Sequence, residues 1–149
     1  MSSALRWVIT CPLHIEKLLD QELRSLGYKD LKPSAGKVSL ESPLEAGFRI
    51  CLWSRLANRV LLQLGEWDGK DGDSIYQNAR EFPWHEHLRP NQTFAISFHG
   101  TNQHIRHPHY GSQILKDALV DHFRDSIGIR PNVDPKNPQM GFWAHLEAN

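Results

Sequence analysis

The side chains best suited to chemistry lie in a segment dense in histidine and arginine that follows residue 99. His104, His107 and His109 come close together there, and His85 and His87 precede them. A zinc site needs ligands at fixed spacing, usually with cysteine or carboxylate help, and a second shell that orients them. Exposed imidazoles in a loop that faces a ligand explain the same residues with fewer conditions, so we predict no metal site.

Other motifs lack the features that their chemistry requires. DGKDGD at 68–73 has the aspartates of a calcium loop but neither the bidentate glutamate nor correctly placed glycines, so a solvated turn is predicted. No GK[ST] or GxGxxG sequence follows a strand, and no GxSxG motif marks a nucleophile. Cys11 and Cys51 each lie in an apolar segment, which predicts buried, reduced thiols without a disulfide or a CxxC site.

A larger group of side chains could bind RNA. Arginine pairs with phosphate through two parallel hydrogen bonds, lysine attracts phosphate as a point charge, and asparagine or threonine contacts sugars and base edges. The alternative is that Arg55 and Arg59 pair with nearby acids, and that Lys116 pairs with Asp117 or Asp121 as ordinary helix-surface charge. The candidate RNA-binding residues are Arg55, Arg59, Thr101, Asn102, His104, Arg106, Tyr110, Lys116, Arg130 and Asn132.

The composition restricts how such binding could work. Lys and Arg number 17, and Asp and Glu also number 17, so the formal net charge is zero. Because proteins that hold nucleic acid by bulk electrostatics are usually strongly basic, RNA binding here would need a local patch. No apolar run approaches the roughly 20 residues that cross a bilayer, and the N-terminus lacks a secretory pattern. We therefore expect a cytoplasmic location and no membrane partner.

The first 66 residues have the pattern of a β-α-β-β-α-β domain, the order of a ferredoxin-like fold. Its second helix is expected to bury Leu44, Phe48, Cys51 and Leu52 on one face. The expected elements are a strand over 6–11, a helix over 13–27 capped by Gly27, a hairpin from 28–33 and 37–41, a helix over 44–54 and a strand over 57–64.

Residues 67–73 interrupt this pattern and mark a domain boundary. The expected elements beyond it are a helical segment over 74–88 interrupted at Pro83, a strand over 93–99, a helix over 111–127 that aligns Ile127 with its buried face and ends at Gly128, an irregular segment over 131–139 and a strand over 140–146. The loop between residues 99 and 111 is the expected ligand-binding position. No partner follows the last strand, and because complete proteins normally cover such an edge, we infer a fragment of a longer protein.

Several stretches resemble one known family. LWSRLANRVLLQLGEW at 52–67, FHGTNQHIRHPHYGSQILKDALVDHF at 98–123 and RPNVDPKN at 130–137 resemble the N-terminal region of bacterial THUMP-containing large-subunit ribosomal RNA guanine methyltransferases, of the L or fused K/L type. The opening WVITCPLHIEKLLDQELRSLGY is similar to their first strand and helix. The resemblance implies an α+β chain, with a ferredoxin-like domain over 1–66 and a THUMP domain over 67–149 that lacks its last strand.

In that family these two domains hold structured RNA, while a later domain binds S-adenosylmethionine and methylates the exocyclic amine of a guanine. This chain has no glycine-rich cofactor loop and no Asn-Pro-Pro-Tyr motif; its pairs are Asn137-Pro138 and the inverted Pro90-Asn91. The resemblance thus implies no cofactor and no catalytic site here, with both in a downstream domain. It points first to Arg106, Tyr110, Gly111 and Lys116, where Gly111 lets the backbone enter the helix closely.

The expected function is an RNA-binding targeting module that docks large-subunit ribosomal RNA for the downstream methyltransferase domain. The alternative is a protein-interaction or homodimerisation module that uses the open sheet edge near residues 140–146 and Trp143. Because histidine gains a proton between about pH 8 and pH 5, RNA affinity should rise from pH 8 to pH 6 at constant salt. The RNA interpretation requires Arg106 and Lys116 to share one exposed surface.

Overall fold

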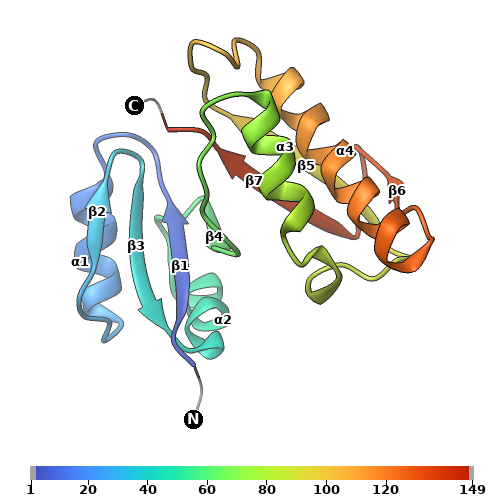
Figure 1. Ribbon diagram of the computed structural model, residues 1–149. Coiled ribbons are helices and arrows are strands. Elements are labelled where there is room, and N and C mark those ends of the chain that lie inside the picture. Colours follow the sequence, from blue (N-terminus) through green and yellow to red (C-terminus); the bar gives the residue numbers. More distant parts are fainter. Residues whose placement is uncertain (1–2, 148–149) are drawn as a thin grey trace. The chain divides into compact units, whose positions relative to one another are not determined.

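The computed structural model describes residues 3–147. Its chain divides into two compact units, Met1–Glu66 and Trp67–Asn149, called here the N-terminal and C-terminal units. Figure 1 shows them in blue to green and in green to red. Each unit has its own sheet and its own helices, so each is described by itself.

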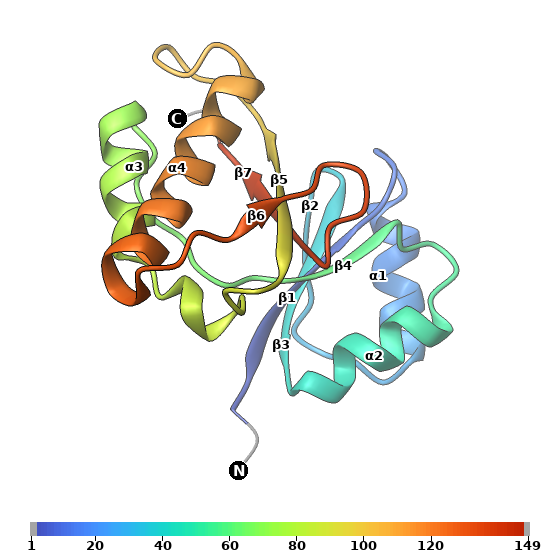
Figure 2. The same ribbon diagram turned by 90° about the vertical axis from the view of Figure 1, so that its right-hand side faces the viewer.

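The N-terminal unit is a four-stranded antiparallel sheet with two helices on one face (Figure 2). Its elements are β1 (Leu5–Thr10), α1 (Glu16–Ser25), β2 (Lys32–Ser34), β3 (Lys37–Ser42), α2 (Leu44–Trp53) and β4 (Arg59–Leu62). The strand order is β2-β3-β1-β4. The predicted ferredoxin-like order is therefore confirmed.

Local chemistry explains how α1 ends. Gly27 has a φ of 96°, its N–H donates to the carbonyl of Arg24, and the Tyr28 N–H donates to the carbonyl of Leu23. This is the left-handed glycine termination that the sequence predicted. The helix begins three residues later than expected because the chain still turns at His14, where φ is 72°.

The prediction for the buried face of α2 was wrong. Phe48 is 68% exposed and Leu52 76% exposed, whereas Ile50 is fully buried. The reason lies at Gly47, where an added Cβ would sit only 2.1 Å from the ring of Trp7. Small residues let α2 approach the sheet around this indole, so the large apolar side chains remain outside. Cys51 is consequently exposed, not buried as predicted, while Cys11 is buried as predicted.

The C-terminal unit is a three-stranded parallel sheet with helices α3 and α4 packed together over one face (Figure 1). Its elements are α3 (Gly72–Glu81), the short 3-10 helix η1 (Trp84–Glu86), β5 (Thr93–His99), α4 (Pro108–Ile127), β6 (Asn132–Val133) and β7 (Met140–His145). The strand order is β6-β5-β7. Phe94, Phe98 and Phe142 supply the core side of this sheet.

Helix α4 differs from its prediction at both ends. It begins at Pro108, where a missing N–H costs nothing, so the last histidine of the rich segment, His109, lies in the first helical turn. Ile127 is 47% exposed and does not belong to the buried face as predicted. The expected glycine termination is present, because Gly128 has a φ of 75°. The segment predicted as irregular after residue 130 contains the short strand β6.

The aspartate-rich turn before α3 has a structural role. Asp71 Oδ1 accepts a hydrogen bond of 2.8 Å from the Ser74 N–H, and the Asp71 N–H donates to Ser74 Oγ at 3.1 Å. This reciprocal pair is a capping box, which satisfies backbone donors at the start of the helix. Among residues 3–147, none of the helices combines the length and apolar character that crossing a bilayer requires.

Candidate nucleic-acid interface

The two units differ in formal charge. Residues 1–66 contain nine Lys and Arg against seven Asp and Glu, whereas residues 67–149 contain eight against ten. Eight of the nine histidines lie in the second range. The unit in which sequence reasoning concentrated the RNA contacts is therefore the more acidic one, unless its histidines carry protons.

The loop after β5 is held in shape by Asn102. Its Nδ2 donates to the carbonyls of Gly69 and Lys70, both at 3.1 Å. Its Oδ1 accepts from the backbone N–H groups of His104 at 2.9 Å and Ile105 at 2.7 Å. Because two donors and two acceptor positions are occupied, this amide fixes the loop and has little left to offer RNA. The sequence predicted that Asn102 contacts RNA. Its hydrogen bonds, one of which is donated by the N–H of the buried Ile105, indicate that Asn102 anchors the loop.

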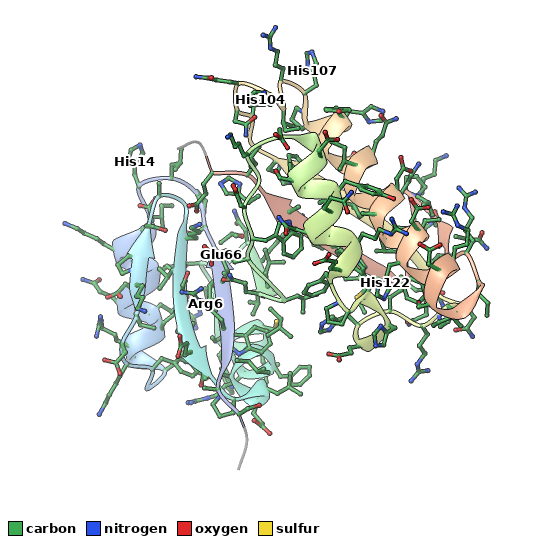
Figure 3. The ribbon with its side chains drawn as sticks, in the orientation of Figure 1. Arg6, His14, Glu66, His104, His107 and His122 are labelled. Carbon is green, nitrogen blue, oxygen red and sulfur yellow. The ribbon has the colours of Figure 1, made fainter. Side chains whose placement is uncertain are left out.

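With Asn102 inside, the loop presents other side chains to solvent. Thr101, His104, Arg106 and His107 are all exposed, and Figure 3 shows His104 and His107 projecting from the loop. Within residues 3–147, no carboxylate lies at ion-pair distance from Arg106. His104 faces the carboxyl of Asp71 closely enough to contribute to the lowering of its pKa, which the Ser74 N–H dominates. Arg106 is thus the cation that this loop offers most openly.

The start of α4 is shaped by packing. An added Cβ at Gly111 would lie 2.5 Å from the ring of Phe98, so glycine is what lets α4 cross β5 this closely. Gly111 is buried and acts on the shape of the surface. Tyr110 is 49% exposed. Its hydroxyl packs close to Gly72, because a Cβ added at Gly72 would lie 3.0 Å from it.

Farther along α4 the surface becomes acidic. Lys116 Nζ lies 3.2 Å from Asp117 Oδ1, the pairing that the sequence offered as the alternative to RNA contact. Arg124 pairs with Asp121 at 2.7 Å, and the Tyr76 hydroxyl also donates to Asp121. Lys116 lies more than two turns into the helix, about 12 Å from its first residue. Lys116 therefore has its charge paired on the helix, and its joint use with Arg106 stays a prediction.

Arg130 and Asn132 lie beyond the other end of α4. Both are exposed. Arg130 lines a shallow hollow between α3 and α4 together with Asp73, Asp117 and Arg124, so charges of both signs meet there. Since a helix of this length spans about 30 Å, these two residues and Arg106 cannot serve a single compact contact.

In the N-terminal unit, Glu22 binds the backbone of Arg55 and not its side chain. Glu22 Oε1 accepts from the Arg55 N–H at 2.7 Å, and Glu22 Oε2 accepts from the Ser54 hydroxyl at 2.6 Å. The nearby acid thus fixes the chain between α2 and β4 and leaves the exposed guanidinium outside this contact. Arg59 is exposed on β4, in register with Thr10 of β1.

The histidines that are close together in the sequence do not form a cluster that could bind a metal ion among the described residues. His85 Nδ1 lies 3.1 Å from His122 Nε2, and His122 Nδ1 lies 2.9 Å from the carbonyl of Arg80. His87 stacks on Phe82. Residues 3–147 contain no group of three or more His, Cys, Asp or Glu side chains arranged to hold a metal ion.

Comparison with known proteins assigns both units. The model of the RlmL ferredoxin-like domain matches residues 6–61, and the model of the THUMP domain matches residues 69–149. This chain belongs to the THUMP domain family. The resemblance stated from the sequence is therefore confirmed for both domains of the THUMP-family chain.

The relatives are longer proteins. Ribosomal RNA large subunit methyltransferase K/L of Cellvibrio japonicus is 38% identical over 144 residues, which are 97% of this chain and 19% of that protein. The corresponding protein of Aeromonas hydrophila is 40% identical over 137 residues, 92% of this chain and 19% of that protein. The chain thus spans about a fifth of the length of the curated relatives that it matches.

Solved structures share the fold. A predicted N6-adenine-specific DNA methylase from Listeria monocytogenes superposes with a TM-score of 0.80 at 23% identity, over 98% of this chain and 38% of that one. SMU.472, assigned as a methyltransferase and complexed with SAH, gives a TM-score of 0.76 at 22% identity, over 100% of this chain and 40% of that one. At these identities the likeness shows the fold alone.

Proposed function

We propose that this chain is an RNA-binding targeting module of a ribosomal RNA methyltransferase. In this proposal it docks large-subunit ribosomal RNA and presents a guanine to a catalytic domain in the remainder of a longer protein. The observation that carries the proposal is the pair of domain matches together with relatives named as large-subunit ribosomal RNA methyltransferases. The loop fixed by Asn102 supports it, because it displays, beside exposed histidines, an Arg106 that has no ion pair within residues 3–147.

The residues of this chain do not fit S-adenosylmethionine, which we assign to the catalytic domain. A cofactor loop of that kind needs glycines that open a cradle after a parallel strand. Gly100 follows β5, but an added Cβ there would lie 2.1 Å from the carbonyl oxygen of Leu146, so this glycine serves packing against the end of β7. In this proposal the chemistry takes place in the catalytic domain, and this chain binds and positions the RNA.

Recognition in this proposal uses a few placed contacts. Arg106 can bind a phosphate through two hydrogen bonds, Tyr110 can stack on an unpaired base, and Arg55 adds a cation from the other unit. A module without net charge has little general attraction for polyanions, which favours selection by shape.

A binding titration tests this proposal. Fluorescence anisotropy with a labelled hairpin from large-subunit ribosomal RNA should give saturable binding by the unmodified chain. Arg106→Ala should weaken it several-fold and lower the salt slope by about 1, as expected for a lost phosphate contact. Arg89→Ala is the matched control, since Arg89 is an exposed arginine of the same unit outside the loop. Equal losses in both variants would exclude a specific role for the loop.

A second candidate function is strand pairing with a protein partner or a second copy. It is favoured by β7, which lies at the edge of the β6-β5-β7 sheet and carries Trp143, 44% exposed. An exposed edge offers unpaired backbone groups to an added strand. Light scattering across a concentration series would reveal dimers, and Ala144→Pro should abolish them if this edge pairs. A monomer at every concentration would exclude self-pairing.

A further inference from the structure

One histidine side chain links three elements of the C-terminal unit. His122 lies on α4 and is marked in Figure 3. Its Nδ1 lies 2.9 Å from the carbonyl oxygen of Arg80, in the last turn of α3, and its Nε2 lies 3.1 Å from Nδ1 of His85 in η1. All of these atoms belong to one compact unit, so the arrangement is complete within it.

The contacts of the two rings assign the position of each proton. A backbone carbonyl only accepts hydrogen bonds, so Nδ1 of His122 must carry a hydrogen and donate it to Arg80. In a neutral imidazole the other nitrogen is then an acceptor. Nε2 of His122 therefore accepts, and Nδ1 of His85 donates to it. The remaining nitrogen, Nε2 of His85, is used by neither of these bonds.

The orientation of the rings suits a direct hydrogen bond. Their planes are within 2° of parallel, and their centroids are 5.4 Å apart. Because the two nitrogens are only 3.1 Å apart, they must point at each other along the line between the centroids. The N–H of one ring thus aims at the lone pair of the other, as a linear hydrogen bond requires.

This contact holds a turn that carries a core residue. η1 places Trp84 in the core, where it is 5% exposed and packs edge-on against Phe82 and Phe142. His85 follows directly, so its bond to His122 links the same turn to α4. Loss of that bond would loosen the turn that positions the indole.

The charges near the two rings are largely paired. Arg80 and Arg124 form ion pairs with Asp125 and Asp121, so neither guanidinium faces the rings without a carboxylate partner. The titratable and charged groups of the three elements around the rings are Tyr76, Arg80 and Glu81 of α3, Glu86 and His87 in or beside η1, and Asp121, Arg124 and Asp125 of α4.

The two rings can hold one added proton together but not two. The first enters at Nε2 of His85, whose Nδ1–H then donates to His122 as part of a cation, which strengthens the bond. A second proton must enter at Nε2 of His122, the atom that accepts this bond. Two N–H groups would then face each other on two neighbouring cations, so the contact opens.

We propose that His85 and His122 form a proton-sensing bridge. The bridge holds η1 against α4 with no added proton or with one, and it opens when both rings are protonated. This inference concerns the fold of the C-terminal unit and does not depend on RNA binding. Sequence reasoning did not pair these histidines, because they lie 37 residues apart.

Nuclear magnetic resonance of the ring nitrogens tests the proton assignment in the unmodified chain. At pH 8 both rings should carry their hydrogen on Nδ1, and Nε2 of His122 should be bare. A hydrogen on Nε2 of His122 at this pH would overturn the bridge, because that atom could then accept nothing from His85.

Amide exchange tests the response to acid. The N–H groups of Glu86, His87 and Leu88 donate to the carbonyls of Pro83 and Trp84, so their protection factors report whether the turn is held. Protection in the unmodified chain should be similar at pH 8 and pH 6.5. It should fall roughly three- to tenfold by pH 4.5, well below the ordinary histidine pKa of about 6.5, as expected for one lost hydrogen bond.

Substitutions at His122 separate the bridge from other effects of acid. His122→Ala removes the bridge, so protection of the turn should be lower than in the unmodified chain at pH 8 and should change little on acidification. His122→Gln supplies an oxygen that accepts from His85 and does not titrate, so protection should persist at pH 4.5. His109→Ala is the matched control, since His109 is an exposed histidine in the first turn of the same helix. It should behave as the unmodified chain does.

The ratio of protection between the unmodified chain and His122→Ala decides the proposal. The ratio should shrink from roughly three- to tenfold at pH 8 toward one at pH 4.5. A ratio of one at pH 8, or a ratio that stays constant on acidification, would reject the bridge even if His122→Gln does not reproduce the contact. Circular dichroism verifies that each variant is folded.

Discussion

The two units bury their cores in similar ways and differ in what they leave outside. In the N-terminal unit, the antiparallel sheet packs one face against two helices, and strand register places Lys37 and Arg59 on either side of Thr10 on the other face. In the C-terminal unit, the candidate contacts lie on a loop and at the two ends of α4, and acids such as Asp117 and Asp121 line the helix between them. The comparison shows that strand pairing brings together cations that are far apart in the sequence, whereas cations that are close in the sequence are separated along a helix.

Substitutions on α2 should give the largest effect and test which side of the N-terminal unit is covered. Ile50→Ala should lower the free energy of unfolding by about 2–5 kcal/mol, because Ile50 is fully buried and its removal leaves a cavity. Phe48→Ala should change it by less than about 1 kcal/mol, since this ring is 68% exposed. Urea denaturation of both variants measures the difference. Comparable losses would mean that Phe48 contributes to the core as much as Ile50 does, which would contradict this orientation of α2.

Asn102→Ala should give an intermediate effect in the C-terminal unit. It removes four hydrogen bonds that shape the loop after β5, so we expect a stability loss of about 1–3 kcal/mol and faster amide exchange at His104 and Ile105. RNA affinity should fall although this amide faces the loop interior. Amide exchange and anisotropy on the same sample test both effects, with Gln103→Ala as the control because Gln103 is exposed in the same loop and is not one of the candidate RNA-binding residues. Unchanged exchange in Asn102→Ala would remove the anchoring role.

Asp71 should give the smallest effect, visible only in acid. The Ser74 N–H holds the pKa of Asp71 below its ordinary value. The stability that this cap contributes is therefore complete above the pKa of an unfolded aspartate, about 3.9, and is lost as the pH falls through the lower folded value. Asp71→Asn keeps the capping oxygen and removes the titration, so its midpoint of thermal unfolding should fall less steeply between about pH 5 and pH 2. Parallel profiles for both proteins would contradict this role.

Periodicity and glycine placement predicted much of the fold. β5 has the bounds expected from its alternation, and Gly27 and Gly128 end their helices as expected, because these signals are local. The buried face of α2 was not predictable from large apolar residues, since the approach of Gly47 to Trp7 is a tertiary contact. The role of Asn102 was hidden for a similar reason: its carbonyl partners, Gly69 and Lys70, lie 33 and 32 residues away.

The candidate site was predicted in part. Arg106 is exposed in the expected loop. Lys116, in contrast, forms an ion pair with the adjacent Asp117, which competes with a phosphate for the ammonium group. Lys37 could not be placed in one row with Thr10 and Arg59, since antiparallel register joins residues that are far apart in sequence. Charge that is built by strand pairing becomes visible only when the sheet is known.

The most direct test of RNA binding by placed cations is the salt dependence of hairpin binding to the unmodified chain. With phosphate contacts from Arg106 and Arg55, the logarithm of the association constant should fall linearly with the logarithm of salt concentration, with a slope of about −1 to −2. A slope near zero, or no saturable binding at low salt, would contradict the account.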